Sequence, residues 1–474
     1  MSAPFDWTLT QAVEALKMGQ ISARELTLAC LERSQSWQPH VNAFISIEAD
    51  RALERADKAD AARRRGGSLG PLHGAPLAHK DMYDRAGRET SCGSKIRKGH
   101  IASATATVIE RLDGAGAGDL GRLNMSEFAL GPTGLNAHFG RARNPWNLDV
   151  VTGGSSSGSG AAIAAGLVYG ALGSDTGGSI RLPAALCGLA GLKPTQGRVS
   201  RFGAMPLSTS QDCVGPLAPT VRDVALLYQA IAGPDPRDPT CARRTVAAPR
   251  PRADLKGVRI GVPRQFYHED VDPEVSEAIA NSRRRLEAMG ATLVEVDLPD
   301  QAPFAELANI VAITEAASIH YDWLRDRGED YGEQVRARLL QGLLVPGVAY
   351  LRALQLRVTM LEDFVAAAFS RCDALHVPVL PSLPPRSADV DVGASPAMPG
   401  VIAGMTRFTR PFSFLGLPAL AQPIGFSAAG LPLSMQLVGP PFAESRLLEI
   451  GIAFEDADGF RRRLPANPFE RSPN

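Results

Sequence analysis

Two turns rich in glycine and serine, and one lysine, carry the residues of this sequence that could do chemistry. The stretch GGSSSGSGAAIAAG, residues 153–166, continues into an apolar, alanine-rich segment, which is unlike a flexible linker between domains. The second turn, GSDTGGS at residues 173–179, places Ser179 directly after two glycines. Backbone N–H groups that no side chain hinders can converge there on a developing negative charge. Neither turn contains the lysine of a phosphate-binding G-x-x-x-x-G-K-[ST] loop.

A serine nucleophile needs a base, and the base that the sequence offers is Lys80. It stands in PLHGAPLAHKDMYD, where a short apolar strand leads into a loop. Lysine is a poor base at its free pKa of about 10.4, but burial disfavours the charged form and lowers that pKa. A neutral Lys80 could accept a proton from the nucleophile, and the hydroxyl of Ser155 could pass it on.

Two other arrangements match parts of these turns. Residues 154–158 match the nucleophile elbow G-x-S-x-G, with Ser156 as the nucleophile. That elbow needs a buried strand before it and a histidine later in the chain, and NPWNLDVVT is a poor strand. The candidates for that histidine are His268, His320 and His376. The triplet DTG at residues 175–177 is typical of aspartic proteases, whose chemistry needs two carboxylates, but the sequence has no second such triplet.

Together these motifs resemble the amidase signature family. The stretches that carry the resemblance are GGSSSGSGAAIAAG, GSDTGGSIRLPAALCGLAGLKPT, HKD and LNMSEFALGPTGLNAHFGRARNPWN. The resemblance runs from about residue 66 to 235 and returns at FLGLPALAQPIGF and GLPLSMQLVGPPF. Ser155 precedes Ser179 by 24 residues and Lys80 precedes it by 99. Both separations fit the family's arrangement of a serine, a serine after a cis peptide bond, and a lysine.

The resemblance implies a role for each of these residues. Ser179 would be the nucleophile, and Ser155, after a cis Gly154–Ser155 peptide, would be the proton bridge. Lys80 would be the base and then the acid for the leaving amine. The implied oxyanion hole consists of the backbone N–H groups of Thr176, Gly177, Gly178 and Ser179.

The elements around these motifs predict an α/β protein. Strands such as VRIGVP and ATLVEVDLP alternate with helices such as PEVSEAIANSRRRLEAMG, which indicates a layered architecture with a buried sheet. The family resemblance implies one α/β/α domain around a large, mixed, twisted sheet. We expect this domain to span residues 1–474, with N-terminal helices (1–65), a catalytic core (66–235), a variable helical and βαβ region that shapes the substrate pocket (236–371), and C-terminal strands and a helix (372–474).

Composition indicates an ordinary soluble globular protein. Of 474 residues, 45% are hydrophobic, and 50 Lys and Arg balance 50 Asp and Glu. Balanced charge argues against a partner held by bulk charge, such as nucleic acid or a membrane surface. The six cysteines form no C-x-x-C pair, which favours free, buried thiols in a reducing compartment. We therefore expect a cytoplasmic protein with no metal and no cofactor.

These observations lead to a prediction about activity and partners. The expected reaction is hydrolysis of the C–N bond of a small to medium amide through an acyl-enzyme on Ser179, with esters or carbamates as further substrates. The expected partner is a small-molecule amide, with no nucleic acid bound directly and no membrane; a homodimer is a possible assembly. The alternative is the glutaminase component, or A subunit, of a tRNA-dependent amidotransferase, which works with partner subunits.

The substrate pocket separates these two alternatives. In the amidotransferase component, an aspartate before the segment NLAGLP helps to bind the amino group of glutamine, and Thr406 stands at that place here. The matching arginine of the central helix is assigned to Arg357. The missing carboxylate favours a stand-alone amidase, since a buried ammonium group without its partner is costly. The predicted substrate contacts are Met125, Arg181, Tyr321 and Phe408, although for Arg181 a role in the scaffold, which GGSIR has in the family it resembles, comes first.

Overall fold

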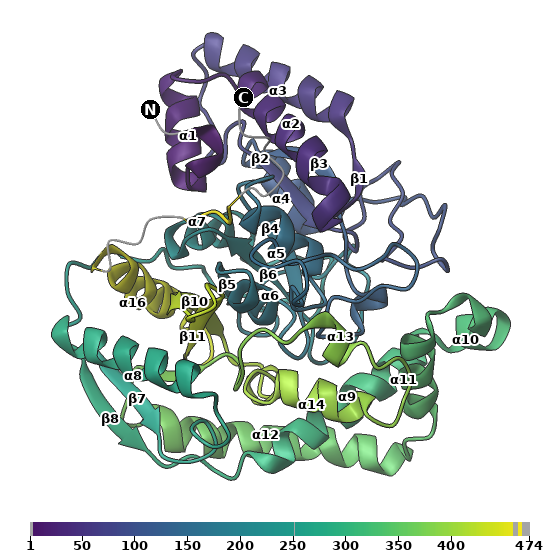
Figure 1. The fold of residues 1–474 in the computed structure, drawn as a ribbon, viewed down its shortest axis with the longest axis vertical. Helices are drawn as coiled ribbons and strands as arrows, with labels where there is room; N and C mark the ends of the chain where they lie inside the picture. Colours follow the sequence, from purple (N-terminus) through teal and green to yellow (C-terminus); the bar gives the residue numbers. More distant parts are fainter. Residues whose placement is uncertain (1–2, 251, 458–462, 467–474) are drawn as a thin grey trace.

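The core of the molecule is an eight-stranded mixed sheet (Figure 1). The structure is a computed structural model, and it describes residues 3–250, 252–457 and 463–466. The strands, in their order across the sheet, are β4 (Ala171–Asp175), β6 (Cys213–Ala218), β5 (Ala190–Lys193), β10 (Ala419–Phe426), β11 (Pro432–Val438), β9 (Ala374–Pro378), β7 (Arg259–Pro263) and β8 (Thr292–Val296). Pairing is antiparallel from β4 to β9 and parallel from β9 to β8.

A second, three-stranded sheet carries Lys80. Its order is β1 (Phe44–Ile47), β3 (Gly118–Leu123) and β2 (Pro76–Lys80). Strand β2 lies beside the segment that enters β4, because the Tyr169 N–H donates to the Pro76 carbonyl at 3.1 Å. The expected α/β architecture with a mixed sheet is confirmed. The three-stranded sheet lies beside β4, the edge strand of the eight-stranded sheet. Every residue of β2, β4, β5, β6, β9 and β11 is buried, as expected for strands covered on both faces.

Helices pack on the large sheet in two groups. One group contains α5 (Ser157–Ala164) and α6 (Arg181–Leu186), which contact each other. Helix α5 also contacts β2, β3, β4 and β6, and α6 contacts β5, β10 and β11. The other contains α7 (Val221–Ile231) and α16 (Glu444–Ala457), which contact each other, and α8 (Pro273–Ala288) lies against β9, β10 and β11. The remaining helix of the core is α4 (Thr107–Gly114), which packs on α7.

The N-terminal helices form a separate layer at the top of Figure 1. They are α1 (Leu9–Met18), α2 (Ala23–Val41) and α3 (Ala49–Arg64). Ser22 and Glu25 form a capping box at the start of α2, in which each side chain accepts a backbone N–H of the other residue. Short 3-10 helices cover Pro4–Asp6, Glu127–Ala129 and Gly328–Asp330.

A helical region covers the opposite end of the sheet (Figure 1). It contains α9 (Ala302–Ile319), α10 (Tyr321–Arg327), α11 (Glu333–Leu343), α12 (Gly347–Phe369), α13 (Ser387–Val390), α14 (Met398–Thr406) and α15 (Arg410–Phe414). Helix α9 packs against α11, α12 and α15. Helices α11 and α12 meet at 90° across a break that contains Pro346.

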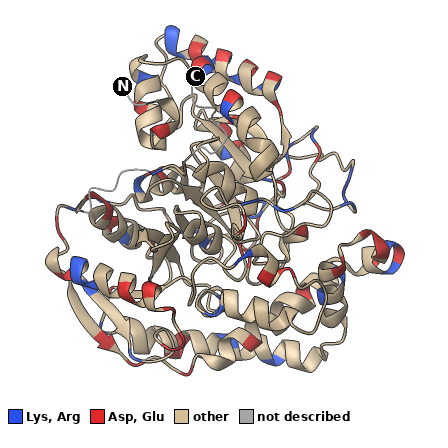
Figure 2. Ribbon diagram, in the orientation of Figure 1, with Lys and Arg blue, Asp and Glu red and all other residues tan. Residues whose placement is uncertain are grey.

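Charged residues lie mainly on the outer helices, and the central strands carry few of them (Figure 2). All six cysteines are free and buried, as predicted. Within the described ranges, no single helix passes as a membrane span; α11 and α12 pass only when they are counted together as a bent pair.

Candidate active site

Lys80 is the last residue of β2, and only 1% of it is exposed. Its Nζ donates hydrogen bonds to Ser155 Oγ at 2.7 Å and to Ser174 Oγ, on β4, at 2.8 Å. Burial lowers the pKa of Lys80 to about 7, against the opposing charges of Asp212 and Asp175. About half of these lysines are therefore neutral at pH 7, so Lys80 can act as a base there.

Ser155 lies directly before α5 and is fully buried. The Gly154–Ser155 peptide bond is cis. A side chain at position 154 would collide with the carbonyl of Gly131 and the N–H of Gly134, so the close approach of these backbones requires glycine. The Ser155 carbonyl also accepts the N–H of Ser126 at 3.0 Å. These contacts hold the Ser155 hydroxyl against Lys80.

Ser179 lies in the loop at residues 176–179 that joins β4 to α6, and it lines a cavity. In the part of the chain that the structure describes, Ser179 and Ser155 share no hydrogen bond. The structure therefore joins Lys80 to Ser155 and places Ser179 on the cavity wall, while the predicted link between the two serines is absent from this geometry.

Three of the four predicted oxyanion-hole residues line the same cavity: Thr176, Gly177 and Ser179. Among the described residues, the backbone N–H groups of these three have no hydrogen-bond acceptor. Gly178 differs, because its N–H donates to Asp175 Oδ1 at 2.8 Å and is therefore not free for an oxyanion. The prediction for Gly178 is therefore corrected.

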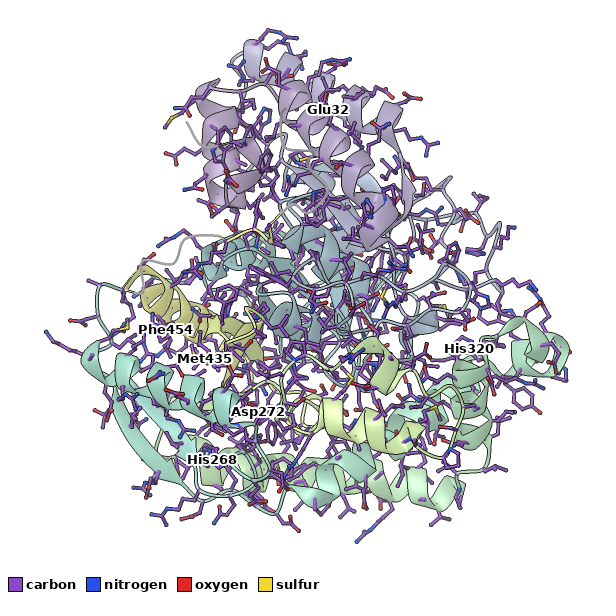
Figure 3. The ribbon with its side chains drawn as sticks, in the orientation of Figure 1. Glu32, His268, Asp272, His320, Met435 and Phe454 are labelled. Carbon is purple, nitrogen blue, oxygen red and sulfur yellow. The ribbon has the colours of Figure 1, made fainter. Side chains whose placement is uncertain are left out.

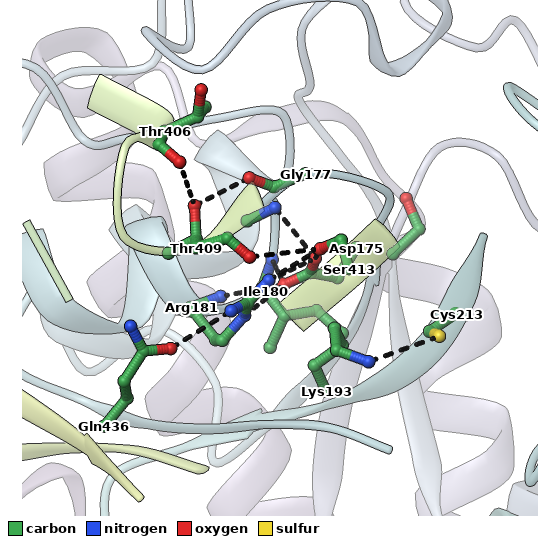
Figure 4. Close-up of polar contacts among 12 residues, drawn as sticks. Asp175, Gly177, Ile180, Arg181, Lys193, Cys213, Thr406, Thr409, Ser413 and Gln436 are labelled. Carbon is green, nitrogen blue, oxygen red and sulfur yellow. Dashed lines mark hydrogen bonds and ion pairs between the residues drawn. The ribbon is translucent and has the colours of Figure 1, made fainter. Parts of the chain in front are cut away.

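Asp175 and Arg181 form a buried ion pair behind this loop (Figure 4). Arg181 Nε lies 3.0 Å from Asp175 Oδ2, and neither side chain is exposed. Arg181 also donates to Ser413 Oγ at 2.7 Å and to Gln436 Oε1 at 3.0 Å. Burial raises the pKa of Asp175, but the charge and hydrogen bonds of Arg181 outweigh it and the net pKa is lowered. Arg181 therefore belongs to the scaffold, and its prediction as a substrate contact is corrected.

The cavity beside Ser179 has a volume of about 50 Å³, which suits a small acyl group. Its polar walls are Thr176, Ser179, Gln211, Asn309, Arg338, Thr406 and Arg410. Its remaining walls, apolar or glycine, are Ala129, Leu130, Gly131, Pro132, Gly177, Leu182, Leu207, Ala308, Ala312 and Ile402. Two arginines therefore face the cavity, and no Asp or Glu is among its described lining residues.

The other predicted substrate contacts lie outside this cavity. Met125 is fully buried against Gly93. Phe408 is fully buried in an aromatic cluster, 5.2 Å between ring centroids from Tyr267. Tyr321 is 55% exposed at the start of α10. These three predictions are corrected: each residue type suits a pocket, but the helix or loop that carries it turns the side chain elsewhere.

The structure also changes which arginine lies at the substrate cavity, a place predicted from the sequence for Arg357. Thr406 lines the cavity as predicted, and its hydroxyl donates to the Ile402 carbonyl at 2.7 Å. Arg357 is outside the cavity, where its guanidinium donates to the Ser210 carbonyl at 2.5 Å. Arg338 on α11 lines the cavity instead. The sequence signal for Arg338 is weak, since an arginine in the charged run EQVRAR is usually exposed.

Each of the three later histidines bonds a group other than Ser156, which argues against the nucleophile-elbow alternative; Figure 3 labels His268 and His320. His320 bonds Tyr331 Oη at 2.9 Å, and His268 bonds the Pro263 carbonyl at 2.7 Å. His376 is 2.8 Å from Ser282 Oγ, on α8. Ser156 lies instead against the Ser174 backbone, whose N–H donates to its hydroxyl at 3.3 Å.

Within the described residues, no group of three His, Cys, Asp or Glu side chains is arranged to hold a metal ion.

Comparison with known proteins decides the family. A family model described as Amidase matches residues 25–448. The chain belongs to the amidase family. This amidase is accordingly an enzyme that hydrolyses C–N bonds.

Relatives of this amidase match over nearly its whole length. The A subunit of the glutamyl-tRNA(Gln) amidotransferase of Symbiobacterium thermophilum is 41% identical, over 94% of this chain and 96% of that protein. A solved structure described as part of a vestigial protein complex, which reveals the origins of an s-triazine catabolic enzyme, is 37% identical with a TM-score of 0.89, covering 96% of this chain and 99% of that one. The native peptide amidase of Stenotrophomonas maltophilia is 30% identical with a TM-score of 0.84, covering 98% and 99%.

These relatives correct two expectations. The sequence favours a stand-alone amidase, but the relative at 41% identity is named as a component of an amidotransferase, as are others at 38–40%. The expectation of a small-molecule partner alone, without nucleic acid, is wrong for the same reason: that name describes one component of an enzyme of glutamyl-tRNA(Gln). The prediction relied on the net charge of the whole chain, but equal numbers of positive and negative residues say nothing about the local surfaces that bind partners.

Proposed function

We propose that this amidase hydrolyses the C–N bond of a terminal carboxamide and acts as the amide-hydrolysing component of an amidotransferase. The observation that carries the chemistry is the 2.7 Å hydrogen bond between Lys80 Nζ and Ser155 Oγ, next to the loop of Ser179. The support for the amidotransferase role is the 41% identity to the A subunit of such an enzyme over 94% of the chain.

In the proposed reaction, Ser179 Oγ attacks the amide carbonyl carbon. Ser179 Oγ then comes within hydrogen-bond distance of Ser155 and passes its proton there, and the proton of Ser155 passes to the neutral amine of Lys80. The N–H groups of Thr176 and Gly177 hold the oxyanion that forms, since both line the cavity without an acceptor among the described residues. Collapse of the tetrahedral intermediate breaks the C–N bond, and the proton from Lys80 returns through Ser155 to the leaving nitrogen, which departs as ammonia.

Water then completes the cycle. Lys80 is neutral again, so it can take a proton from water through Ser155 while the water oxygen attacks the acyl-enzyme. The ester bond to Ser179 breaks, the serine recovers its proton, and the acid leaves as a carboxylate. In an amidotransferase assembly, the ammonia would be the group passed on to the acceptor.

The nucleophile is tested with Ser179→Ala and a fluorophosphonate label. Wild type should be labelled at Ser179 and should release ammonia from at least one amide, whereas the variant should do neither. Ser282→Ala is the control, because that buried serine lies on α8 and bonds the Ile279 carbonyl. Normal turnover by Ser179→Ala would overturn the assignment.

The amidotransferase role has its own test. The chain is purified from its native host together with the proteins that bind it, and ammonia release is measured with and without glutamyl-tRNA. The proposal expects copurifying partner proteins and a rate that rises when they and the tRNA are present. A chain that purifies alone, and whose rate the tRNA leaves unchanged, would contradict the amidotransferase role but not the chemistry.

A further inference from the structure

The cavity beside Ser179 contains two guanidinium groups from separate helices. Arg338 comes from α11 and is only 9% exposed, and Arg410 is the first residue of α15. Burial lowers the pKa of Arg410 to about 10, and burial together with the charge of Arg410 lowers the pKa of Arg338 to about 10. Both groups are therefore still cationic at neutral pH, and they are close enough to repel each other.

Neither guanidinium has a partner in the described parts of the chain: no hydrogen bond, ion pair or aromatic ring contacts either one. Arg338 is buried and Arg410 is half-buried. Arginines withdrawn from water are normally paired, since an isolated buried charge is costly. Arg357, also half-buried, shows the usual situation, because it is bonded to Ser210 and Gln196. The two cavity arginines are thus arranged for an anion that comes from outside the chain.

Arg410 stands directly beside the loop that carries the nucleophile. A side-chain carbon at Gly177 would lie 3.7 Å from Arg410 Nε. The preceding residue, Thr409, donates its hydroxyl to the Gly177 carbonyl at 2.7 Å, which fixes the start of α15 against that loop (Figure 4). An anionic group bound by Arg410 therefore lies close to an acyl group attached to Ser179.

The other polar walls are neutral: Gln211, Asn309 and Thr406. With no carboxylate among the described lining residues, a substrate ammonium group would add a third positive charge and find no anion to pair with. A substrate carboxylate would instead neutralise the repulsion between Arg338 and Arg410 and accept charge-assisted hydrogen bonds from them.

We propose that this cavity selects amides whose acyl part carries a carboxylate and no ammonium group, namely short monoamides of dicarboxylic acids, and that Arg410 determines the selection. This inference rests on the proposed amide hydrolysis at Ser179 and names the acyl group that the site accepts; in an amidotransferase assembly, such a monoamide, and not glutamine, would then supply the ammonia.

Three probes separate the charges. Glutaramate is glutamine without its ammonium group, and pentanamide has a methyl group in place of the carboxylate of glutaramate. With the purified full-length chain, kcat/KM for ammonia release should be at least tenfold higher for glutaramate than for either of the others. A cavity that prefers glutamine, or does not distinguish pentanamide from glutaramate, would overturn the inference while leaving amide hydrolysis intact.

Arg410→Gln tests the residue. Loss of one charge-assisted bond should lower kcat/KM for glutaramate about 10- to 100-fold, mainly through KM, and leave pentanamide unchanged. Arg410→Lys should recover part of the preference, because it restores the charge without the planar fork. Arg357→Gln, which removes an arginine outside the cavity, should keep the wild-type ratio. An unchanged ratio in Arg410→Gln would refute its role.

A binding measurement makes the test independent of turnover. Glutarate should slow fluorophosphonate labelling of Ser179 in wild type, and glutamate, which adds an ammonium group, should do so much less. Arg410→Gln should lose the protection by glutarate. If Ser179 is not labelled at all, the proposed hydrolysis itself fails; if it is labelled and glutamate protects as well as glutarate, only the inference about charge fails.

Discussion

Ser174 offers a way to move the pKa of Lys80 in either direction without touching the lysine. Its hydroxyl accepts a hydrogen bond from Lys80 Nζ at 2.8 Å, and burial already lowers the pKa of Lys80 to about 7. The charges that oppose that shift are those of Asp212 and Asp175. Ser174→Asp would add a carboxylate at bonding distance, and Ser174→Ala would remove an acceptor that stabilises the charged lysine.

The size of each shift follows from the ordinary strength of these interactions. An adjacent opposite charge raises a pKa by about 1–3 pH units. At pH 7 the neutral fraction of Lys80 in Ser174→Asp would then be about 5- to 500-fold below that of wild type. Loss of a hydrogen bond to a charged group, about 1.5–3 kcal/mol, lowers the pKa by about one to two pH units. Ser174→Ala would therefore keep more than about half of its plateau rate at pH 6, where wild type keeps about one-tenth.

The assay is kcat/KM for ammonia release between pH 5 and pH 10, which reports the pKa of the free enzyme. Since a neutral Lys80 is the active form, each rate should rise with pH through the pKa of Lys80 and then level off. The rise should move to higher pH in Ser174→Asp, to lower pH in Ser174→Ala, and stay in place in the Ser282→Ala control. The same rise in all four proteins, or a shift of both Ser174 variants in one direction, would refute Lys80 as the base.

Two further predictions concern stability. Asp175→Asn leaves the buried Arg181 without its carboxylate and should lower the free energy of unfolding, measured in urea, by about 3–5 kcal/mol. Asp326→Asn, which breaks an exposed ion pair with Arg325, is the control and should unfold like wild type. Equal losses of unfolding free energy in the two variants would contradict the argument. Gly158→Ala places a side chain against the buried backbone of Ala43 and Asn124 and should lower the melting temperature by several degrees. Gly347→Ala, whose side chain would meet open space, is the control and should not lower it. Equal melting temperatures for the two variants would show that α5 tolerates the side chain.

The residues proposed for chemistry could be predicted from the sequence because each belongs to a short motif. Lys80 ends a buried strand, and Ser155 and Ser179 stand in glycine turns just before a helix. Their positions depend on backbone geometry within a few residues, which local sequence determines. The Gly178 N–H is an exception, since Asp175 captures it through a contact that the motif alone does not specify.

Only the tertiary structure decided what surrounds Ser179. Arg338 and Arg410 come from helices far apart in the chain, and they reach one cavity because α9 packs against both α11 and α15. Met125, Tyr321 and Phe408 were expected there because their residue types suit a pocket, yet a pattern of apolar residues indicates that a face is buried and not which element covers it. By itself, the sequence determined the α/β fold, the amidase family and the proposed reacting groups. The charge of the pocket depended on long-range packing, which places side chains that no local motif connects.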